Sequence, residues 1–522
     1  MKLTKTLVSA LALWAFLLPA GASAAPAITA VLNNYSYTPP GYPNSGVTPS
    51  TLFIIQGTGL ANATSGPVTL QSSAPPGLPT TLNGATVSVT VGGVTVTPGM
   101  YYALPTQIAA VLPGATPAGT ASVTVSLAGT PSAAFQFQVV PAAVGLDTYY
   151  GTGTGLVTAT DSQTGALINT TNSATPGETI VLWGSGLGAD TADPDTLFTS
   201  SPHAVNQSST QVYFGSMEGT VVYAGSSGYP GLNQINVTIP ANVGVGCRVS
   251  IVAVVSGVDS NFATIPINPS GGVCSDPVYS YNGTDLAAAV QTSSSTSGIV
   301  AVEQLATTGI ADVTVTLNSG GIGDTAPGPD SLGGCTVALV GGPTGVGGTF
   351  SYLSVGTVSV QGPEGTYSLT NPNGPYSVSL PAGAIPASGG TYTFTASGSA
   401  QVGPFTATVN LSPLMTWTNS SAAKTVTRSA GLVINWSGGS PGYIQINGQS
   451  SASTNVSASY SCYVAQSAGT FTVPPFVLNE LPAGTGNTTV ENFTTHIPFT
   501  VSGINSPYTE GGNIVNAVST YQ

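Results

Sequence analysis

The stretch TPSTLFIIQGTGL, residues 48–60, decides the fold because the chain contains it twice. The second copy is TPGETIVLWGSGL, residues 175–187, and its residues lie 127 positions after their counterparts. The same spacing relates Gln107-Ile108 to Gln234-Ile235. Two landmarks that share one spacing indicate that a whole domain is duplicated, and a repeat outranks any local interpretation of its motif.

Alternation of apolar and polar residues predicts an all-β chain. In ATVSVTVGGVTVT, residues 85–97, valines alternate with Thr and Ser on both sides of Gly92-Gly93. Alternation places the valines on one face, and the glycines supply the positive φ that a two-residue hairpin turn requires. Further strands are predicted at residues 122–127, 211–214, 249–255, 357–360, 366–369, 391–396 and 405–411, and a short helix at 285–291. Many short strands between Gly/Pro turns predict tandem immunoglobulin-like β-sandwich domains.

Four domains are expected after an export signal. A signal peptide is predicted at residues 1–24, because Lys2 and Lys5 precede an apolar stretch that ends at the small residues 22–24. A membrane anchor is the alternative, but the apolar stretch is short for the ~20 residues of a membrane span. The predicted domains are two immunoglobulin-like domains, 25–142 and 143–273, and two β-sandwich-like domains, 274–412 and 413–522. No second long apolar segment follows, so the mature chain is expected to be secreted and to lack a membrane span.

Charge excludes two classes of partner. Charged residues make up 4% of the chain, against an average of about 25%. After removal of the signal peptide, three basic residues would remain beside 18 acidic ones. Nucleic-acid binding and binding to an anionic membrane surface both need clustered cations, which these three residues do not provide. At 41% hydrophobic residues the chain can still bury cores.

Four cysteines predict two disulfides, because an exported chain with an even number of cysteines usually pairs them. Three pairings exist. Cys247 and Cys274 lie at the two ends of the last strands of one predicted domain, which favours Cys247–Cys274 and leaves Cys335–Cys462. The spacings do not match a metal site.

The duplicated motif resembles repeats in secreted proteins of acidobacteria, which are similar to immunoglobulin-like domains of the IPT/TIG type. The residues that carry the resemblance are Pro49, Gly57, Gly59, Leu60, Gln107, Ile108 and Pro113, with Pro176, Gly184, Gly186, Leu187, Gln234, Ile235 and Pro240 in the second copy. Residues 331–335, 416–419 and 469–474, with Cys462, resemble the downstream part of such proteins. The resemblance implies the fold and export, and it implies no catalytic residues.

Two motifs look like enzyme signatures. Residues 438–442, GGSPG, match the Gly-x-Ser-x-Gly nucleophile elbow. That elbow uses the backbone N–H of the residue after the serine, and here that residue is Pro441, which has none. Residues 184–189 match a loose dinucleotide fingerprint, but a helix should start at the glycines and none is predicted. The equivalent glycines of the first copy indicate a scaffold role instead.

Acidic residues offer the one metal candidate. Asp190, Asp193 and Asp195 follow the second copy of the motif, and converging carboxylates bind Ca²⁺. A solvated acidic loop is the alternative, and the first copy lacks these acids. The only histidines, His203 and His496, fall in different predicted domains, so neither a two-histidine metal site nor a catalytic triad is expected.

Carbohydrate chemistry is harder to place. Tyrosines cluster at positions 35, 37 and 42, at 101 and 102, at 149 and 150, and at 279 and 281, where they would stack on sugars or pack at domain junctions. Glycoside hydrolysis needs two acids on facing strands, which the sequence does not pair. Surface solvation is the expected role of Glu480, Glu491 and Glu510.

The sequence therefore predicts a secreted, non-enzymatic, adhesion-type interaction protein without a cofactor, whose partner is an extracellular protein or glycan. A carbohydrate-binding or carbohydrate-degrading protein is the alternative, and a structural spacer is a third reading.

Overall fold

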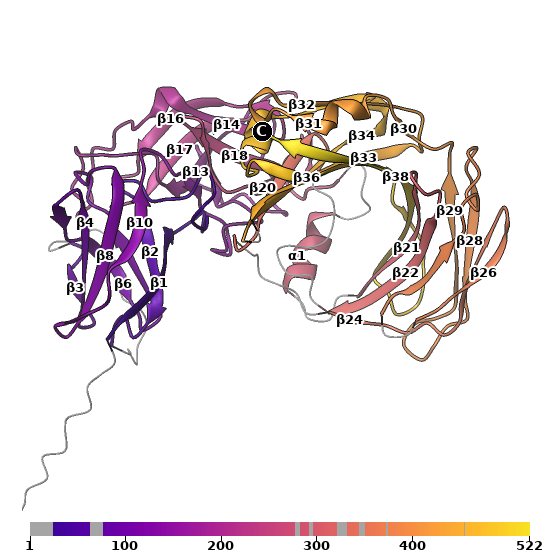
Figure 1. Ribbon diagram of the computed structural model, residues 1–522, viewed down its shortest axis with the longest axis horizontal. Coiled ribbons are helices and arrows are strands. Elements are labelled where there is room, and N and C mark those ends of the chain that lie inside the picture. The colour runs from indigo at the N-terminus through magenta and orange to yellow at the C-terminus, as the bar shows by residue number, and fades with distance from the viewer. Residues whose placement is uncertain are drawn as a thin grey trace, which may run out of the picture.

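The chain forms an arch of β-sandwich units. The computed structural model describes residues 25–62, 77–276, 282–291, 296–320, 331–343, 350–371, 374–453 and 455–522. The predicted signal peptide therefore lies outside the described residues. Figure 1 shows the first repeat at one end of the arch and the unit that contains β26, β28 and β29 at the other.

The first repeat is a two-sheet sandwich. Its sheets have the strand orders β1-β2-β7-β6 and β10-β8-β4-β3, and β5 and β9 pair with β4 and β8. The strands are β1 (Ala27–Asn33), β2 (Leu52–Thr58), β3 (Thr81–Leu82), β4 (Ala85–Val91), β5 (Val94–Val96), β6 (Gly99–Ala103), β7 (Gln107–Val111), β8 (Gly119–Leu127), β9 (Thr130–Pro131) and β10 (Phe135–Val139). The predicted hairpin is confirmed, since β4 and β5 pair across Gly92 and Gly93, which have φ values of 54° and 86°.

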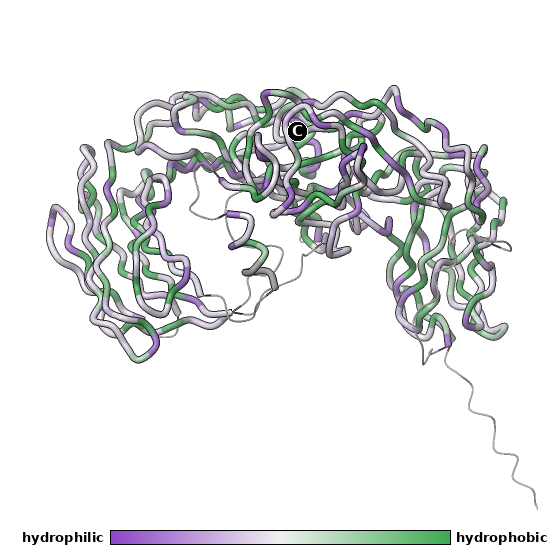
Figure 2. The backbone as a smooth tube through the Cα atoms, turned by 180° about the vertical axis from the view of Figure 1, so that it is seen from behind, coloured by the Kyte–Doolittle hydropathy of each residue, from purple (hydrophilic) through white to green (hydrophobic). Residues whose placement is uncertain are grey.

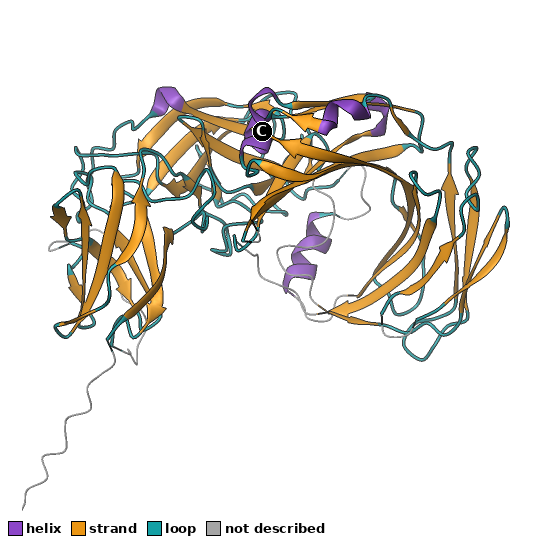
Figure 3. Ribbon diagram, viewed as in Figure 1, coloured by secondary structure: helices purple, strands orange, loops and turns teal. Residues whose placement is uncertain are grey.

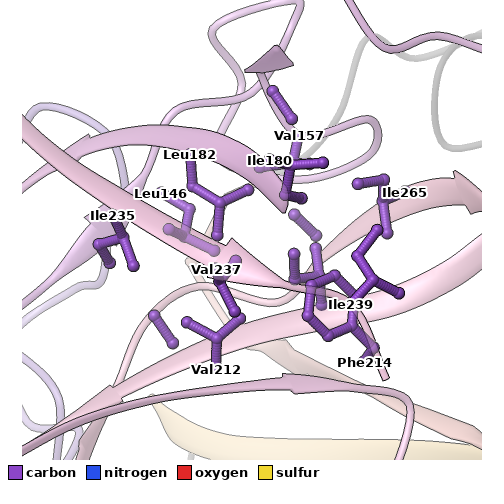
Figure 4. Packing of buried hydrophobic residues seen from close by; sticks show 14 of the residues in the cluster. Leu146, Val157, Ile180, Leu182, Val212, Phe214, Ile235, Val237, Ile239 and Ile265 are labelled. Atoms are coloured by element: carbon purple, nitrogen blue, oxygen red, sulfur yellow. The ribbon is translucent and has the colours of Figure 1, made fainter. Parts of the chain in front are cut away.

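The second repeat has the same architecture. Its sheets have the orders β11-β13-β17-β16, joined by β12, and β15-β14-β18-β19, joined by β20. The strands are β11 (Gly145–Leu146), β12 (Ala159–Asp161), β13 (Thr179–Ser185), β14 (Thr210–Phe214), β15 (Met217–Glu218), β16 (Thr220–Ser226), β17 (Asn233–Thr238), β18 (Gly246–Val255), β19 (Val258–Asp259) and β20 (Ala263–Ile267). Its core fills the space between the two sheets, as Figure 4 shows for Leu182, Val212, Ile235 and Ile265.

Strand register confirms the duplication. Ile55 lies opposite Ile108 in the pairing of β2 with β7, and Leu182 lies opposite Ile235 in the pairing of β13 with β17. These residues occupy the positions related by the 127-residue spacing. The motif and the Gln-Ile landmark are therefore neighbouring strands of one sheet in both repeats, and the all-β prediction of tandem immunoglobulin-like sandwiches is confirmed.

The second half of the chain is built on one large sheet of eleven described strands. Its main order is β23-β34-β33-β36-β38-β21-β22-β24, and β27, β31 and β37 pair at its borders. The strands are β21 (Thr296–Leu305), β22 (Ala311–Gly320), β23 (Gly334–Leu339), β24 (Phe350–Tyr352), β27 (Tyr376–Leu380), β31 (Thr425–Val426), β33 (Gly442–Ser453), β34 (Val456–Ala465), β36 (Gly484–Thr494), β37 (Ile497–Pro498) and β38 (Ser506–Tyr521). We call it the central sheet.

Two smaller sheets cover one face of the central sheet and enclose two cores. The first is β26-β25-β28-β29 and the second is β30-β32-β35. Their strands are β25 (Val358–Gly362), β26 (Gly365–Leu369), β28 (Gly390–Ala396), β29 (Phe405–Leu411), β30 (Thr416–Trp417), β32 (Leu432–Ser437) and β35 (Thr470–Val473). Figure 2 shows hydrophobic residues distributed along the strands of the whole arch, with few strongly hydrophilic segments, as the low charge implies.

The boundary expected at residues 412/413 falls inside this arrangement. β21 pairs in parallel with β38, so Ser297 lies opposite Ser506, and β23 pairs with β34. Each pairing joins a strand before the boundary to a strand after it. The two predicted sandwich-like domains thus share one continuous sheet, because long-range pairing satisfies strand edges that would otherwise be open.

Helices are few, as Figure 3 shows. The predicted helix is confirmed as α1 (Gly283–Gln291), and α2 (Pro475–Asn479) is a single turn. Short 3₁₀ turns occur at Gln207–Ser209, Ser420–Lys424, Arg428–Ala430 and Gln466–Ala468. Among the described residues, no helix is both long and apolar enough to cross a membrane.

Both favoured disulfides are present. Cys247 is bonded to Cys274, and Cys335 is bonded to Cys462. The second bond connects residues that lie directly opposite each other on β23 and β34. It therefore locks a pairing between strands that the sequence places on either side of the expected boundary.

Candidate functional site

The central sheet has one apolar and one polar face. Directly opposed residues of neighbouring strands project from the same face. Ile444, Ile446 and Val490 point into a core and are fully buried. The side chains between them in sequence form the opposite face, on the side of the sheet where α1 lies (Figures 1 and 3).

Hydroxyl and amide side chains dominate this second face on β23, β34, β33, β36 and β38. Pairing arranges them in three rows of neighbours, which run across the strands. The rows are Thr336, Ser461, Asn447, Thr489 and Asn516; Ala338, Ser459, Gln449, Asn487 and Val518; and Ser457, Ser451, Thr485 and Thr520. We call these residues the amide–hydroxyl face.

The amide–hydroxyl face is accessible and internally ordered. Gln449, Ser459 and Asn487 are exposed, and Val518 at the same level is 82% exposed. The Ser461 hydroxyl donates to Asn447 Oδ1 at 2.7 Å. Such bonds hold the side chains in place on a rigid sheet and leave other lone pairs and N–H groups free to meet a ligand.

Carboxyl groups gather at one border of this face. Glu491, Glu510 and Glu303 lie on the successive strands β36, β38 and β21, and we call these three residues the carboxyl cluster. Burial raises the pKa of Glu303 to about 7, and repulsion by Glu510, Glu491 and Asp312 adds to the shift. Burial, with repulsion by Glu510, also raises the pKa of Glu491 to about 7, although Asn447 Nδ2 donates to its carboxylate at 3.2 Å. Near neutral pH Glu303 and Glu491 therefore exist in both protonation states and can donate as well as accept hydrogen bonds.

Aromatic rings lie next to the carboxyl groups. His496 Nε2 is 3.1 Å from Glu510 Oε2, and the imidazole stacks on Tyr508 with ring centroids 4.0 Å apart. Tyr443, Tyr463 and Phe493 form a buried aromatic cluster, and Tyr443 meets the His496 ring edge to face with centroids 6.1 Å apart. Tyr508 is half-buried, whereas the other rings named here are buried, so Tyr508 is the most exposed of these aromatic side chains.

The sequence-based reading of three acids was wrong. Glu480, expected at the surface, is only 3% exposed. Glu491 and Glu510 were also expected to be solvated, but both are partly buried members of the carboxyl cluster. The third member, Glu303, has no signal in the sequence that sets it apart. No local signal identifies this group, because its members are brought together by the order of β36, β38 and β21 in the sheet.

Two of the three predicted calcium residues, Asp190 and Asp193, converge with His203, and the ligand atoms of these three residues lie within 4.8 Å of one another. Asp195 Oδ1 accepts from the backbone N–H of Gly114 in the first repeat at 2.7 Å. Asp190 and Asp193 instead face His203, whose Nε2 lies 2.8 Å from Asp190 Oδ1 and whose Nδ1 lies 3.4 Å from Asp193 Oδ1. The hydrogen bond that His203 makes to the Asp190 carboxylate is the main cause that raises the pKa of His203.

The acidic loop also joins the two repeats. The Ser50 hydroxyl, in the first repeat, donates to the Asp190 carbonyl at 2.8 Å and accepts from the Asp190 N–H at 3.0 Å. Asp190 Oδ1 further accepts from the N–H of Ala192. The carboxylates that a cation would need are thus engaged in contacts within the protein.

We expect the melting temperature to be the same in millimolar CaCl₂ and in EDTA. Ca²⁺ requires six to eight oxygen ligands, and here Asp195 Oδ1 accepts from the Gly114 N–H while the carboxylates of Asp190 and Asp193 face His203. Differential scanning fluorimetry in the two buffers measures the effect. A rise with Ca²⁺ that Asp193→Asn abolishes would contradict the expectation.

The enzyme-like motifs occupy turns. Residues 438–441 connect β32 to β33, and the Ser440 hydroxyl accepts from the Ser412 N–H at 2.9 Å. In the dinucleotide-like motif, the N–H groups of Gly186 and Leu187 donate to Asn233 Oδ1. Both motifs are therefore tied into the β scaffold.

The clustered tyrosines that the structure describes lie at junctions, on the surface or partly buried. The Tyr42 hydroxyl donates to the carbonyls of Val340 and Ser457, and the Tyr101 hydroxyl donates to the Pro230 carbonyl, so both link separate units. Tyr149 and Tyr150 are 49% and 40% exposed and meet edge to face. Tyr35, Tyr37 and Tyr102 are partly buried, and positions 279 and 281 lie outside the described residues.

No protein-family profile and no curated sequence matches the chain. Among solved structures it is similar to the Bacteroides ovatus mixed-linkage glucan utilization locus protein SGBP-B in complex with a mixed-linkage heptasaccharide, with 14% identity, coverage of 79% of this chain and 94% of that one, and a TM-score of 0.17. The plexin A4 extracellular region is 8% identical, with coverage of 80% of this chain and 33% of that one and a TM-score of 0.13. The FN1–FN3 domains of chicken CNTN1 are 10% identical, with coverage of 70% of this chain and 98% of that one and a TM-score of 0.16. At such TM-scores these neighbours carry no information about a ligand.

Proposed function

We propose that this chain is an exported, non-enzymatic, adhesion-type binding protein, and that its amide–hydroxyl face binds a hydroxyl-rich polymer such as a cell-surface or matrix glycan. The observation that carries the proposal is the array of Ser, Thr, Asn and Gln side chains in three rows, of which Gln449, Ser451, Ser459, Thr485, Asn487, Asn516 and Thr520 are exposed. The two disulfides and the predicted signal peptide support an oxidising, extracellular location. Kinship with the acidobacterial secreted proteins is part of the same proposal.

Chemistry favours a glycan over a charged ligand. Hydroxyl and amide groups both donate and accept hydrogen bonds, as sugar hydroxyls do. Neighbouring strands place equivalent side chains about 4.8 Å apart, so the face presents a regular array to an extended chain. Because the groups are uncharged and held on a sheet, binding loses little to desolvation or to ordering of side chains.

Carbohydrate degradation is the second candidate, and the carboxyl cluster of Glu303, Glu491 and Glu510 favours it. A carboxyl group whose pKa is near 7 suits general acid catalysis, and glycosidases pair such an acid with a second, ionised carboxylate that acts as nucleophile or base. Release of reducing ends from polysaccharide by the wild-type protein, lost in Glu491→Gln, would favour this candidate.

Adsorption to insoluble polysaccharides and a glycan array test the proposal. The combined variant Gln449→Ala, Ser459→Ala and Asn487→Ala should bind about a hundredfold more weakly, since each lost hydrogen bond is worth about 1 kcal/mol. The matched control replaces Thr366, Thr395 and Thr406 with alanine, on exposed positions of β26, β28 and β29.

Two outcomes would sink the proposal. The wild-type protein could bind no glycan on either assay, or the combined variant could bind as tightly as the control. Binding to a protein receptor that the combined variant leaves unchanged would move the function to another surface.

A further inference from the structure

The second repeat packs tightly against the C-terminal half of the chain. Phe476 of α2 stacks on Tyr213 of β14, with centroids 4.5 Å apart, and lies 6.4 Å from Phe262. Val252 and Phe262 of the second repeat belong to the same buried cluster as the residues beneath α2. The junction is therefore packed largely through apolar and aromatic side chains.

Two acids lie inside this junction. Asp259 ends β19 of the second repeat, and Glu480 follows α2 in the C-terminal half. Each is 3% exposed, and the two carboxyl groups lie close enough to interact. A hydrogen bond between two carboxyl groups needs a proton on one of them, because ionised carboxylates only accept.

Neighbouring charges do not neutralise the pair. Arg428, in the 3₁₀ turn packed on α2, donates to the Leu481 carbonyl at 2.6 Å and the Asn479 carbonyl at 3.4 Å. Tyr213 on β14 is the other titratable group that faces Asp259. Among the described residues, no ion pair joins either acid to a cation.

We propose that Asp259 and Glu480 form a proton-dependent latch that holds the second repeat against the C-terminal half and loosens when the pair loses its proton. A second ionised carboxylate in this apolar junction would repel the first and lack solvation. Opening the junction hydrates both groups. The unprotonated pair therefore favours the open junction.

The direction of the pH effect follows from the two pKa shifts. Burial raises the pKa of Asp259 to about 8, and burial with repulsion by Asp259 raises the pKa of Glu480 well above its usual range. The closed junction then holds more protons than the open one. The stabilisation is complete below about pH 4, where solvated acids are protonated, and it declines as pH rises through the folded pKa near 8. The open population grows tenfold per pH unit for each proton released.

Hydrogen exchange detected by mass spectrometry, from about pH 5 to pH 8, tests the latch on the full chain. After correction for intrinsic rates, peptides that contain β19 and α2 should lose protection about tenfold per pH unit. The double variant Asp259→Asn with Glu480→Gln keeps hydrogen-bonding side chains but removes the titration, so its protection should not depend on pH. Glu480→Gln alone provides a milder variant that should flatten the profile.

Two comparisons make the test decisive. Glu218→Gln, an exposed acid on β15 in the same repeat, should retain the wild-type profile. Peptides of β4 in the first repeat should show no pH dependence. A flat wild-type profile, an unchanged profile in the double variant, or equal loss of protection in β4 would each overturn the latch. Glycan binding does not enter this test.

Discussion

Replacing both Cys335 and Cys462 with alanine is expected to lower the free energy of unfolding of the C-terminal half by about 4 kcal/mol. The bond closes a loop with a sequence separation of 127 residues. Cross-linking so distant a pair removes much of the conformational entropy of the unfolded chain. Both sulfurs are also buried in the core beneath the central sheet, so truncation leaves a small void.

Urea unfolding followed by tryptophan fluorescence measures this loss. Trp417 and Trp436 lie in that core, and Trp183→Phe removes the signal of the second repeat. The matched control replaces Cys247 and Cys274, whose separation is 27 residues. Because the shorter loop has less entropy to lose, its removal should cost about 1 kcal/mol less. Equal costs, or no cost for the long loop, would contradict the loop-entropy explanation.

Gly57→Ala in the duplicated motif is expected to destabilise the first repeat by about 3 kcal/mol. A Cβ added at Gly57 would lie 2.0 Å from the Ala27 carbonyl oxygen on the neighbouring strand β1. This oxygen belongs to the backbone, so relief requires β1 to move away from β2 and lose pairing. Gly184 in the second repeat meets the Gly145 carbonyl at 2.2 Å in the same way.

Gly59→Ala, two residues further on, provides the comparison. Gly59 has φ of +63° and no atom within 4 Å of an added Cβ. Its replacement should therefore cost only the ~1 kcal/mol of a left-handed backbone. Opening free energies of β2 from hydrogen exchange in the full chain measure both variants. Similar values for the two would show that strand proximity does not explain the motif.

Local and repeated signals were readable from the sequence. The Gly92-Gly93 hairpin depends on alternation and two glycines, which act within a few residues. The duplication appeared as one spacing at two landmarks, and it also removed the dinucleotide reading of Gly184 and Gly186. Cysteine count and position led to the two disulfides found in the structure.

Long-range pairing was not readable. β21 and β38 pair in parallel although about two hundred residues separate Ser297 from Ser506, and a parallel pairing leaves no turn in the sequence to announce it. That pairing places Glu303 beside Glu510, although no motif in the sequence relates these two positions. The burial of Glu480 against Asp259 arises in the same way from packing between separate units.

The sequence by itself determined the β-sandwich repeats, because hydrophobic alternation, turn glycines and duplication are properties of short segments. Only the tertiary structure decided where the amide–hydroxyl face, the carboxyl cluster and the Asp259–Glu480 pair lie. Each depends on which strands become neighbours, and that choice follows from burying whole sheets rather than from any local pattern. The repeated glycine motif therefore identifies the scaffold, while the proposed binding face lies on the sheet built beyond it.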